Sequence, residues 1–279
     1  MNGKLYLCAT PIGNLGDITY RCVEVLKSVD LIAAEDTRRT LQLLNHLEIE
    51  KPLTSYFEHN RREKGEYLIN EMKKGKNIAL VSDAGTPAIS DPGEDLVRLC
   101  AEHGVDVVPV PGAVAGINAL ISSGLSTGRF AFEGFLTVNK HGRAEMLEKL
   151  KNEERTMIFY EAPHKLNATL RDMGKYFGNR KIALCRELTK LHEEIRRTTL
   201  EEAAAYYAEN PPRGEFVLVV EGKNPDEIKE ENERKWAEMS VAEHIAAYLS
   251  QGMTEKDAIK AAAKDRGVSK RDIYNEYKR

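Results

Sequence analysis

The chain has 279 residues, of which 42% are hydrophobic and 30% are charged, as is typical of a globular protein with a sizeable core. Lys and Arg number 41 against 44 Asp and Glu, so the formal net charge is −3. This balance argues against a generally basic nucleic-acid binder, although it allows basic charge on selected faces. No apolar run approaches the ~18 residues of a membrane span, and the apolar stretch near the N-terminus is too short for a secretory signal.

Short apolar segments alternate with amphipathic ones along the first part of the chain. In chain order, strands are expected at 5–9, 31–34, 78–81 and 105–110, and helices at 19–29, 37–47, 60–74 and 93–103. Continuous apolar strands separated by helices predict an α/β domain with a parallel, doubly wound sheet over residues 1–112. Turn-forming clusters follow the four strands, at 10–17, 35–38, 82–91 and 111–115. Because ligands bind beyond the carboxyl ends of parallel strands, we expect the functional site at this edge.

A second α/β domain is expected over residues 113–223. Its strands are expected at 129–135, 156–160, 181–186 and 216–221, and its helices at 117–122, 142–151, 165–177 and 200–209. Residues 224–239 are rich in Asn, Asp, Glu and Lys, and they are interpreted as a linker or a solvated helix.

Residues 240–279 are expected to form a small helical domain. Ser240 followed by Glu243 matches a capping box, and further helices are expected at 254–265 and 270–277. A glycine lies in the turn before the last helix, an arrangement that resembles a helix-turn-helix unit. A helical lid or a dimerisation clip fits the same pattern equally well.

Two of the turn clusters contain candidate ligand-binding residues. Residues 10–19 read TPIGNLGDIT, which is neither G-x-G-x-x-G nor a P-loop, so a phosphate cradle is not expected. Asp17 in this turn is either a helix N-cap or a ligand. Residues 82–93 contain two aspartates. Asp91 is interpreted as the cap of the following helix, which leaves Asp83 as the ligand candidate.

The order and spacing of seven segments resemble a known family. The segments are ATPIGNLGDIT, AAEDTR, SDAGTPAISDPG, VPGAVAGINALISSGL, FEGFL, FYEAPHKL and CRELTKLHEE. Together they resemble the RsmI-type 16S rRNA 2′-O-ribose methyltransferases, which belong to the tetrapyrrole-methylase-like SAM-dependent methyltransferases. The resemblance covers about residues 4–222, and the terminal helices also resemble that family's C-terminal domain. The first turn lacks the G-x-G-P-G-D of the tetrapyrrole methylases, which favours RNA over a corrin or porphyrin as substrate.

The resemblance implies a fold, a cofactor and partners. It implies two α/β domains with S-adenosyl-L-methionine (SAM) in the cleft between them, no metal, and a homodimer. The implied substrate is the ribose of a cytidine in 16S rRNA or the small ribosomal subunit, at position 1402 in the usual rRNA numbering. The residues implied to bind SAM are Pro11, Gly13, Asn14, Asp17, Asp83, Ala84, Gly85, Thr86, Val114, Ala115 and Glu161.

Methyl transfer to a ribose hydroxyl depends on positioning, and a base or a cation beside the acceptor oxygen helps it. The candidates for this role follow the strand ends and are Glu35, Asp36, Glu161, His164, Glu187 and Lys190. Some have structural alternatives, since Asp36 is also a candidate helix cap and a single His is more often structural.

Basic charge is concentrated in two segments. Residues 134–198 hold 14 Lys and Arg against 9 Asp and Glu, and residues 254–279 hold 8 against 5. Candidates for contact with RNA phosphates are Arg38, Lys140, Arg143 and Arg186. Lys140 and Arg143 are expected on a flexible connection after the strand that ends at residue 135.

The cysteines give an expectation about the redox state of the protein. The four cysteines, which are Cys8, Cys22, Cys100 and Cys185, form no C-x-x-C pair, so we expect reduced core thiols in a cytoplasmic protein.

Two alternative functions remain open. A small-molecule methylase acting on a tetrapyrrole is one alternative, and the first turn and the basic C-terminal segment speak against it. A non-catalytic RNA-binding or ribosome-assembly factor is the other, and Asp83 with the Gly-rich cleft speaks against it.

Overall fold

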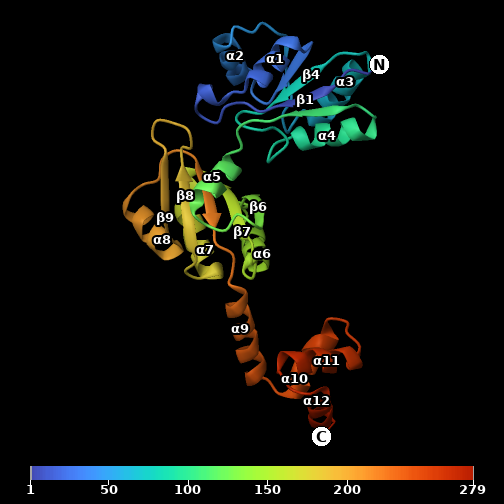
Figure 1. Ribbon diagram of the computed structural model, residues 1–279, viewed down its shortest axis with the longest axis vertical. Helices are drawn as coiled ribbons and strands as arrows, with labels where there is room; N and C mark the ends of the chain where they lie inside the picture. The colour runs from blue at the N-terminus through green and yellow to red at the C-terminus, as the bar shows by residue number, and fades with distance from the viewer. Residues whose placement is uncertain (1, 279) are drawn as a thin grey trace.

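The computed structural model describes residues 2–278, apart from the side chains of residues 231–233, 235 and 237. Two α/β domains lie one above the other, and a long helix carries a small helical domain away from them (Figure 1). In this described part of the chain, no helix is both long and apolar enough to cross a membrane.

The first domain has a sheet of five parallel strands in the order β3-β2-β4-β1-β5. The strands are β1 (Leu5–Cys8), β2 (Leu31–Ala34), β3 (Leu53–Ser55), β4 (Ile78–Val81) and β5 (Val107–Val110). The helices are η1 (Leu15–Asp17, a 3-10 turn), α1 (Tyr20–Ser28), α2 (Thr37–His46), α3 (Arg61–Lys73) and α4 (Gly93–Glu102). The parallel sheet is confirmed. Strand β3 was not predicted, because three half-buried edge residues carry no apolar period.

The second domain has a mixed sheet in the order β6-β7-β10-β8-β9, in which β6 and β7 are parallel and the other pairs are antiparallel. The strands are β6 (Phe130–Phe135), β7 (Thr156–Glu161), β8 (Lys181–Arg186), β9 (Glu194–Thr199) and β10 (Phe216–Val220). The helices are α5 (Ala115–Ser123), α6 (Lys140–Leu150), α7 (Pro163–Phe177) and α8 (Leu200–Glu209). Strand β9 was not predicted, since its sequence EIRRTT is polar and lies at the sheet edge.

Helix α5 links the two domains. It follows β5 of the first sheet, yet its inner side packs on the second, where Ala119 and Leu120 share an apolar cluster with Ile158 and Val219. The other face of the second sheet carries a larger cluster with α6, α7 and α8. All four cysteine thiols are free and buried, as expected.

The last four helices form the C-terminal part of the chain. They are α9 (Pro225–Glu238), α10 (Val241–Ser250), α11 (Glu255–Asp265) and α12 (Lys270–Tyr277). The predicted capping box is present, because the Ser240 hydroxyl accepts from the Glu243 N–H while the Glu243 carboxylate accepts from the Ser240 N–H. Helices α10 to α12 bury an apolar cluster of their own. The segment interpreted as a linker or solvated helix is the helix α9.

Candidate active site

Two turns at the carboxyl edge of the first sheet are tied together by backbone hydrogen bonds. The Thr10 N–H donates to the Gly85 carbonyl at 2.9 Å, and the Gly85 N–H donates to the Thr10 carbonyl at 3.1 Å. Gly85 has a φ of +81°, which suits a residue without Cβ. The turns after β1 and β4 therefore form one double wall, and this wall has a different hollow on each side.

On one side of the wall, a cavity of about 430 Å³ opens between the two sheets. From the first domain, Ile12, the segment 84–86 and Ile89 line it, and α5 contributes its N-terminal Val114 and Ala115. From the second domain, it is lined by Phe135, Tyr160, Glu161, Ala162, Pro163, Cys185, Glu187, Leu188, Lys190, Glu215, Phe216 and Val217. Six of the residues implied by resemblance to bind SAM thus meet at one cavity.

A cluster of three charged side chains lines the second-domain side of this cavity. The Lys190 ammonium donates to Glu187 Oε1 and to Glu215 Oε2, each at 2.9 Å. The hydrogen bond from the Glu215 N–H, together with Lys190, lowers the pKa of the Glu187 carboxyl. Although partial burial opposes it, pairing with the two carboxylates raises the pKa of Lys190. Both pKa shifts favour the ionised forms of Glu187 and Lys190.

The segment that carries Lys190 also touches the first domain. A Cβ built on Gly13 would lie 2.4 Å from Lys190 Cγ and 3.1 Å from the Leu188 carbonyl oxygen. Within the same segment, Glu187 and Thr189 have φ values of +50° and +67°. A non-glycine residue in this region is strained unless its surroundings hold it. At Gly13, the approach of Lys190 and Leu188 leaves no room for a Cβ, so this position requires glycine.

The carboxylates that follow β2 and β4 are held close to one another. The Asp36 N–H donates to Asp83 Oδ1 at 3.0 Å, and Arg39 Nη1 lies 3.2 Å from Asp83 Oδ2. Asp36 also caps α2, since its carboxylate accepts from the N–H of Arg38 and pairs with that guanidinium. Burial, and then the charge of Asp83, raise the pKa of the Glu35 carboxyl. None of these carboxylates lines the cavity, and Asp83 lies on the other side of the wall.

The carboxylate of Glu161 points into the second domain. It is buried, and it accepts from the Ala162 N–H at 2.8 Å and from the Thr169 hydroxyl. Thr169 in turn accepts from Arg143 at 2.9 Å, and Arg143 pairs with Asp172 at 2.7 Å. The prediction of Arg143 on a flexible connection facing phosphates was wrong. It lies within α6, where its methylene groups and donors are buried against α7.

The remaining predicted residues do not line the cavity. Asp17 belongs to η1 and caps no helix, because Asn14 caps η1 and Thr19 caps α1. The Asp91 carboxylate accepts from the Gly93 N–H at 2.7 Å at the start of α4, although the N-cap position itself is occupied by Pro92. His164 is exposed at the start of α7 and does not line the cavity.

The other candidates for RNA contact differ in their ion pairing and in their exposure to solvent. Arg186 pairs with Glu194 at 3.3 Å, whereas Arg38 is largely exposed beside Asp36. Lys140 is exposed at the first residue of α6.

Glu215, which lines the cavity, was not among the predicted site residues. It directly precedes β10, whereas the site residues were predicted only at positions that follow the carboxyl end of a strand.

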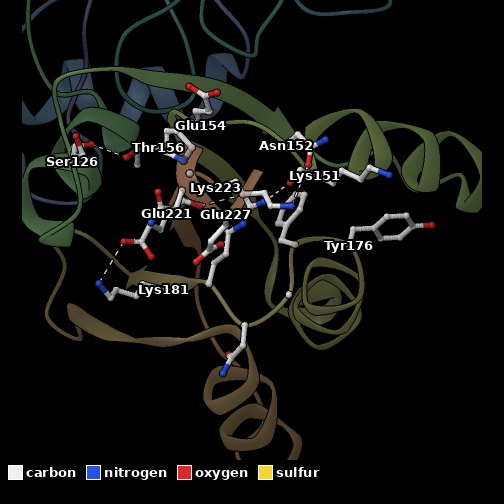
Figure 2. Close-up of a pocket in the computed structure, with 17 residues that line it drawn as sticks. Ser126, Lys151, Asn152, Glu154, Thr156, Tyr176, Lys181, Glu221, Lys223 and Glu227 are labelled. Atoms are coloured by element: carbon white, nitrogen blue, oxygen red, sulfur yellow. Dashed lines mark hydrogen bonds and ion pairs between the residues drawn. The ribbon is translucent and has the colours of Figure 1, made fainter. Parts of the chain in front are cut away.

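A larger hollow lies elsewhere. It has a volume of about 1200 Å³ and lies at the opposite end of the second domain, beside the start of α9 (Figure 2). Lys181 pairs with Glu221 there, and Lys223 Nζ donates to Asn152 Oδ1. A Cβ on Gly222 would lie 2.0 Å from the Glu154 carbonyl oxygen. This hollow is the seam where α9 leaves the domain, and its polar groups pair with one another.

Comparison with known proteins shows the family to which the chain belongs. The sequence model of the Tetrapyrrole (Corrin/Porphyrin) Methylases matches residues 4–204. The chain belongs to this family. The tetrapyrrole methylase fold, expected as two α/β domains with a helical C-terminal part, is thereby confirmed.

Several relatives of this tetrapyrrole methylase chain have the same name. Ribosomal RNA small subunit methyltransferase I of Halalkalibacterium halodurans is 52% identical over 275 residues, covering 99% of this chain and 94% of that protein. The protein of that name from Bacillus subtilis has the same identity and coverage. The one from Thermotoga maritima is 46% identical over 221 residues, which are 79% of this chain and 99% of that protein.

Solved structures of tetrapyrrole methylase fold are similar at low sequence identity. Diphthine synthase has a TM-score of 0.61 at 13% identity, covering 80% of this chain and 91% of that one. Uroporphyrin-III C-methyltransferase from Thermus thermophilus, complexed with S-adenyl homocysteine, has a TM-score of 0.57 at 18% identity, with coverages of 78% and 97%. At such identities, the likeness concerns the fold alone.

Proposed function

We propose that this protein transfers a methyl group from SAM to RNA of the small ribosomal subunit. The observation that carries the proposal is the match at 52% identity, over 99% of the chain, to proteins named ribosomal RNA small subunit methyltransferase I. From the resemblance of its seven segments, we assign the acceptor as the 2′-oxygen of a cytidine, at position 1402 in the usual rRNA numbering.

The residues of the cavity fit SAM. Its volume of about 430 Å³ lies within the range of about 300–1,000 Å³ for small-molecule pockets. A Cβ on Gly85 would come within 3.1 Å of Ile12 and 3.3 Å of the Ala113 carbonyl oxygen, so the backbone itself forms part of the wall. Ile12 and other apolar side chains provide contact surface, and the carboxylates of Glu187 and Glu215 suit a ligand with cationic groups.

When bound, SAM supplies an electrophilic methyl group on a sulfonium. The chain contributes orientation and exclusion of water, which are the main needs of an in-line displacement. The ammonium of Lys190 is held at the cavity by Glu187 and Glu215, and there it stabilises negative charge on an attacking oxygen. We propose Glu35 as the proton acceptor because it follows β2 at the carboxyl edge of the sheet, although it does not itself line the cavity.

Methylation of small subunits that lack the modification tests this proposal. Purified protein is incubated with labelled SAM and either small ribosomal subunits, protein-free 16S rRNA or a tetrapyrrole precursor. We expect label in RNA as an alkali-resistant dinucleotide that contains cytidine, since a 2′-O-methyl group blocks cleavage of the adjacent phosphodiester. Label in a base would overturn the ribose assignment. Label in the tetrapyrrole and none in RNA would overturn the proposal as a whole.

We also propose that two copies of the chain pair through an apolar face beside the cavity. A hollow of about 570 Å³ is lined by Ile117 of α5 and by Phe130 and Phe132 of the edge strand β6, all of which are exposed. Ile121, one turn further along α5, is 69% exposed. An apolar face continuous with an open strand edge favours a self-complementary contact. Light scattering should show a dimer that Ile121→Glu dissociates, and a monomeric wild type would contradict this.

A further inference from the structure

A second hollow lies on the opposite side of the double wall from the cavity. It has a volume of about 310 Å³ and runs between the turn after β1 and the face of α2. Pro11 and Leu15 line it from the turn after β1, Arg39, Gln42 and His46 line it from α2, and Asp83 lines it from the turn after β4. We call it the α2 groove. None of its α2 residues follows a strand directly, and none of them was among the predicted site residues.

Helix α2, which forms one side of the groove, is basic, although the first domain as a whole is acidic. Residues 1–112 hold 13 Lys and Arg against 17 Asp and Glu. In contrast, Thr37–His46 contains two Arg and one His and no Asp or Glu. Arg39, Gln42 and His46 are spaced by three and four residues, so their donors share one helix face. Helix α2 lies on the side of the first domain away from α3 and α4 (Figure 1).

The donors along the groove suit a phosphodiester backbone. The Arg39 side chain is 64% exposed, and its contact to Asp83 involves Nη1, which leaves the rest of its planar fork for an anion. Gln42 and His46 are exposed further along the helix. Leu15 presents an exposed apolar side chain on the facing wall, against which a base can lie. A nucleotide requires this combination of donors and an apolar surface.

The groove and the cavity share their wall. Ile12 lines the cavity while its neighbours Pro11 and Gly13 line the groove, and Ala84 lines the cavity while Asp83 lines the groove. A strand of RNA that lies in the groove therefore crosses only the width of this wall to place the next ribose over the cavity.

We propose that the α2 groove binds the RNA segment next to the methylated nucleotide, with its phosphates on Arg39, Gln42 and His46. This inference rests on the proposed function and adds to it the path of the substrate. The alternative is that RNA reaches the cavity only over the basic second domain, in which case α2 makes no contact.

A matched pair of charge variants tests the groove. Gln42→Glu places a negative charge among the donors and leaves the Arg39–Asp83 contact in place. Asn45→Glu places the same charge on the same helix at an exposed residue outside the groove. We expect Gln42→Glu to raise the KM for small-subunit RNA by about fivefold or more, and Asn45→Glu to change it less than twofold. The kcat and the Kd for SAM should stay within twofold of the wild type for both.

Crosslinking gives a second readout that does not depend on turnover. All four native thiols are buried, so Gln42→Cys and Asn45→Cys each introduce a single exposed thiol for a photoreactive label. We expect the label at residue 42, and not at residue 45, to crosslink to RNA near the methylated nucleotide.

The outcomes separate the two proposals. If the wild type transfers no methyl group to small-subunit RNA, the proposed function fails. If it does, and the two Glu variants have the same KM while neither label crosslinks, the groove proposal alone is overturned. A change in the Kd for SAM with no change in the KM for RNA would also overturn it, since the groove would then belong to the cofactor site.

Discussion

The hydroxyl of Tyr160 accepts a hydrogen bond from the backbone N–H of Gly116 at 3.2 Å, and this contact joins β7 to the first turn of α5. Burial raises the pKa of this phenol, so it stays neutral and keeps its geometry at physiological pH. The Tyr160 ring packs edge-to-face on Phe132 and Phe135, with ring centroids 5.0 and 5.6 Å apart. Tyr160 thus lines both the cavity and the apolar hollow, and it fixes the helix end next to Val114 and Ala115.

Removing the Tyr160 hydroxyl should weaken cofactor binding more than it weakens the fold. In Tyr160→Phe the ring packing remains, while the Gly116 N–H loses its acceptor at a cost of about 0.5–1.5 kcal/mol. We expect the Kd for SAM to rise by about two- to tenfold with kcat nearly unchanged. Calorimetric titration measures the Kd, and Tyr176→Phe, far from the cavity, serves as the control. A lower melting temperature with an unchanged Kd would contradict the positioning role.

An alanine at position 13 should force the two domains apart. Its Cβ would overlap Lys190 Cγ and press on the Leu188 carbonyl, and relief of such overpacking costs about 1–3 kcal/mol. We expect Gly13→Ala to weaken SAM binding by about tenfold. Gly128→Ala is the matched control, because a Cβ there would meet nothing within 4 Å. Equal Kd values for the two variants would show that the contact between Gly13 and Lys190 does not shape the cavity.

The pH dependence of Glu35 has a definite sign. Because burial and Asp83 raise its pKa, the ionised carboxylate is disfavoured in the folded state, and its contribution to stability is lost as the pH rises through the raised value. Glu35→Gln should therefore melt at or above the wild-type temperature at pH 8, with a smaller difference near pH 4.

The same substitution tests the proposed proton acceptor. If Glu35 takes the hydroxyl proton, wild-type kcat/KM should decrease as the pH is lowered below the raised pKa of Glu35. Glu35→Gln should then lose about 10²-fold or more in rate and show no such acidic limb. The exposed Glu50→Gln is the control. A variant with full activity and a wild-type profile would remove Glu35 from the mechanism.

The C-terminal helices should contribute to RNA binding rather than to the cofactor site. A chain that ends at Lys223 keeps the bond from the Lys223 N–H to the Glu153 carbonyl and loses a part with its own apolar cluster. We expect SAM binding within twofold of the full chain, and a KM for small subunits raised by about tenfold through the loss of the basic segment 254–279, which holds 8 Lys and Arg against 5 Asp and Glu. A truncated chain that no longer binds SAM would contradict this separation.

The strand ends illustrate how much could be predicted. Strands 31–34 and 78–81 were predicted with the bounds observed, because both are buried on both faces and form uninterrupted apolar runs. The edge strands β3 and β9 were not predicted, since an edge strand is defined by its neighbour and not by its own hydrophobicity. Arg143 shows the same limit, because its basic side chain suggests a surface and α7 buries it.

The sequence by itself predicted the central strands and most of the helices in their chain order, and the family to which the chain belongs. It also predicted the carboxyl edge of the first sheet as the site. These depend on local patterns and on segments short enough to compare. Only the tertiary structure decided that Asp83 lies outside the cavity, that Glu215 lines it, and that α2 faces a separate groove. Those outcomes depend on which side of one double turn each side chain lies, and residue spacing along the chain does not encode that choice.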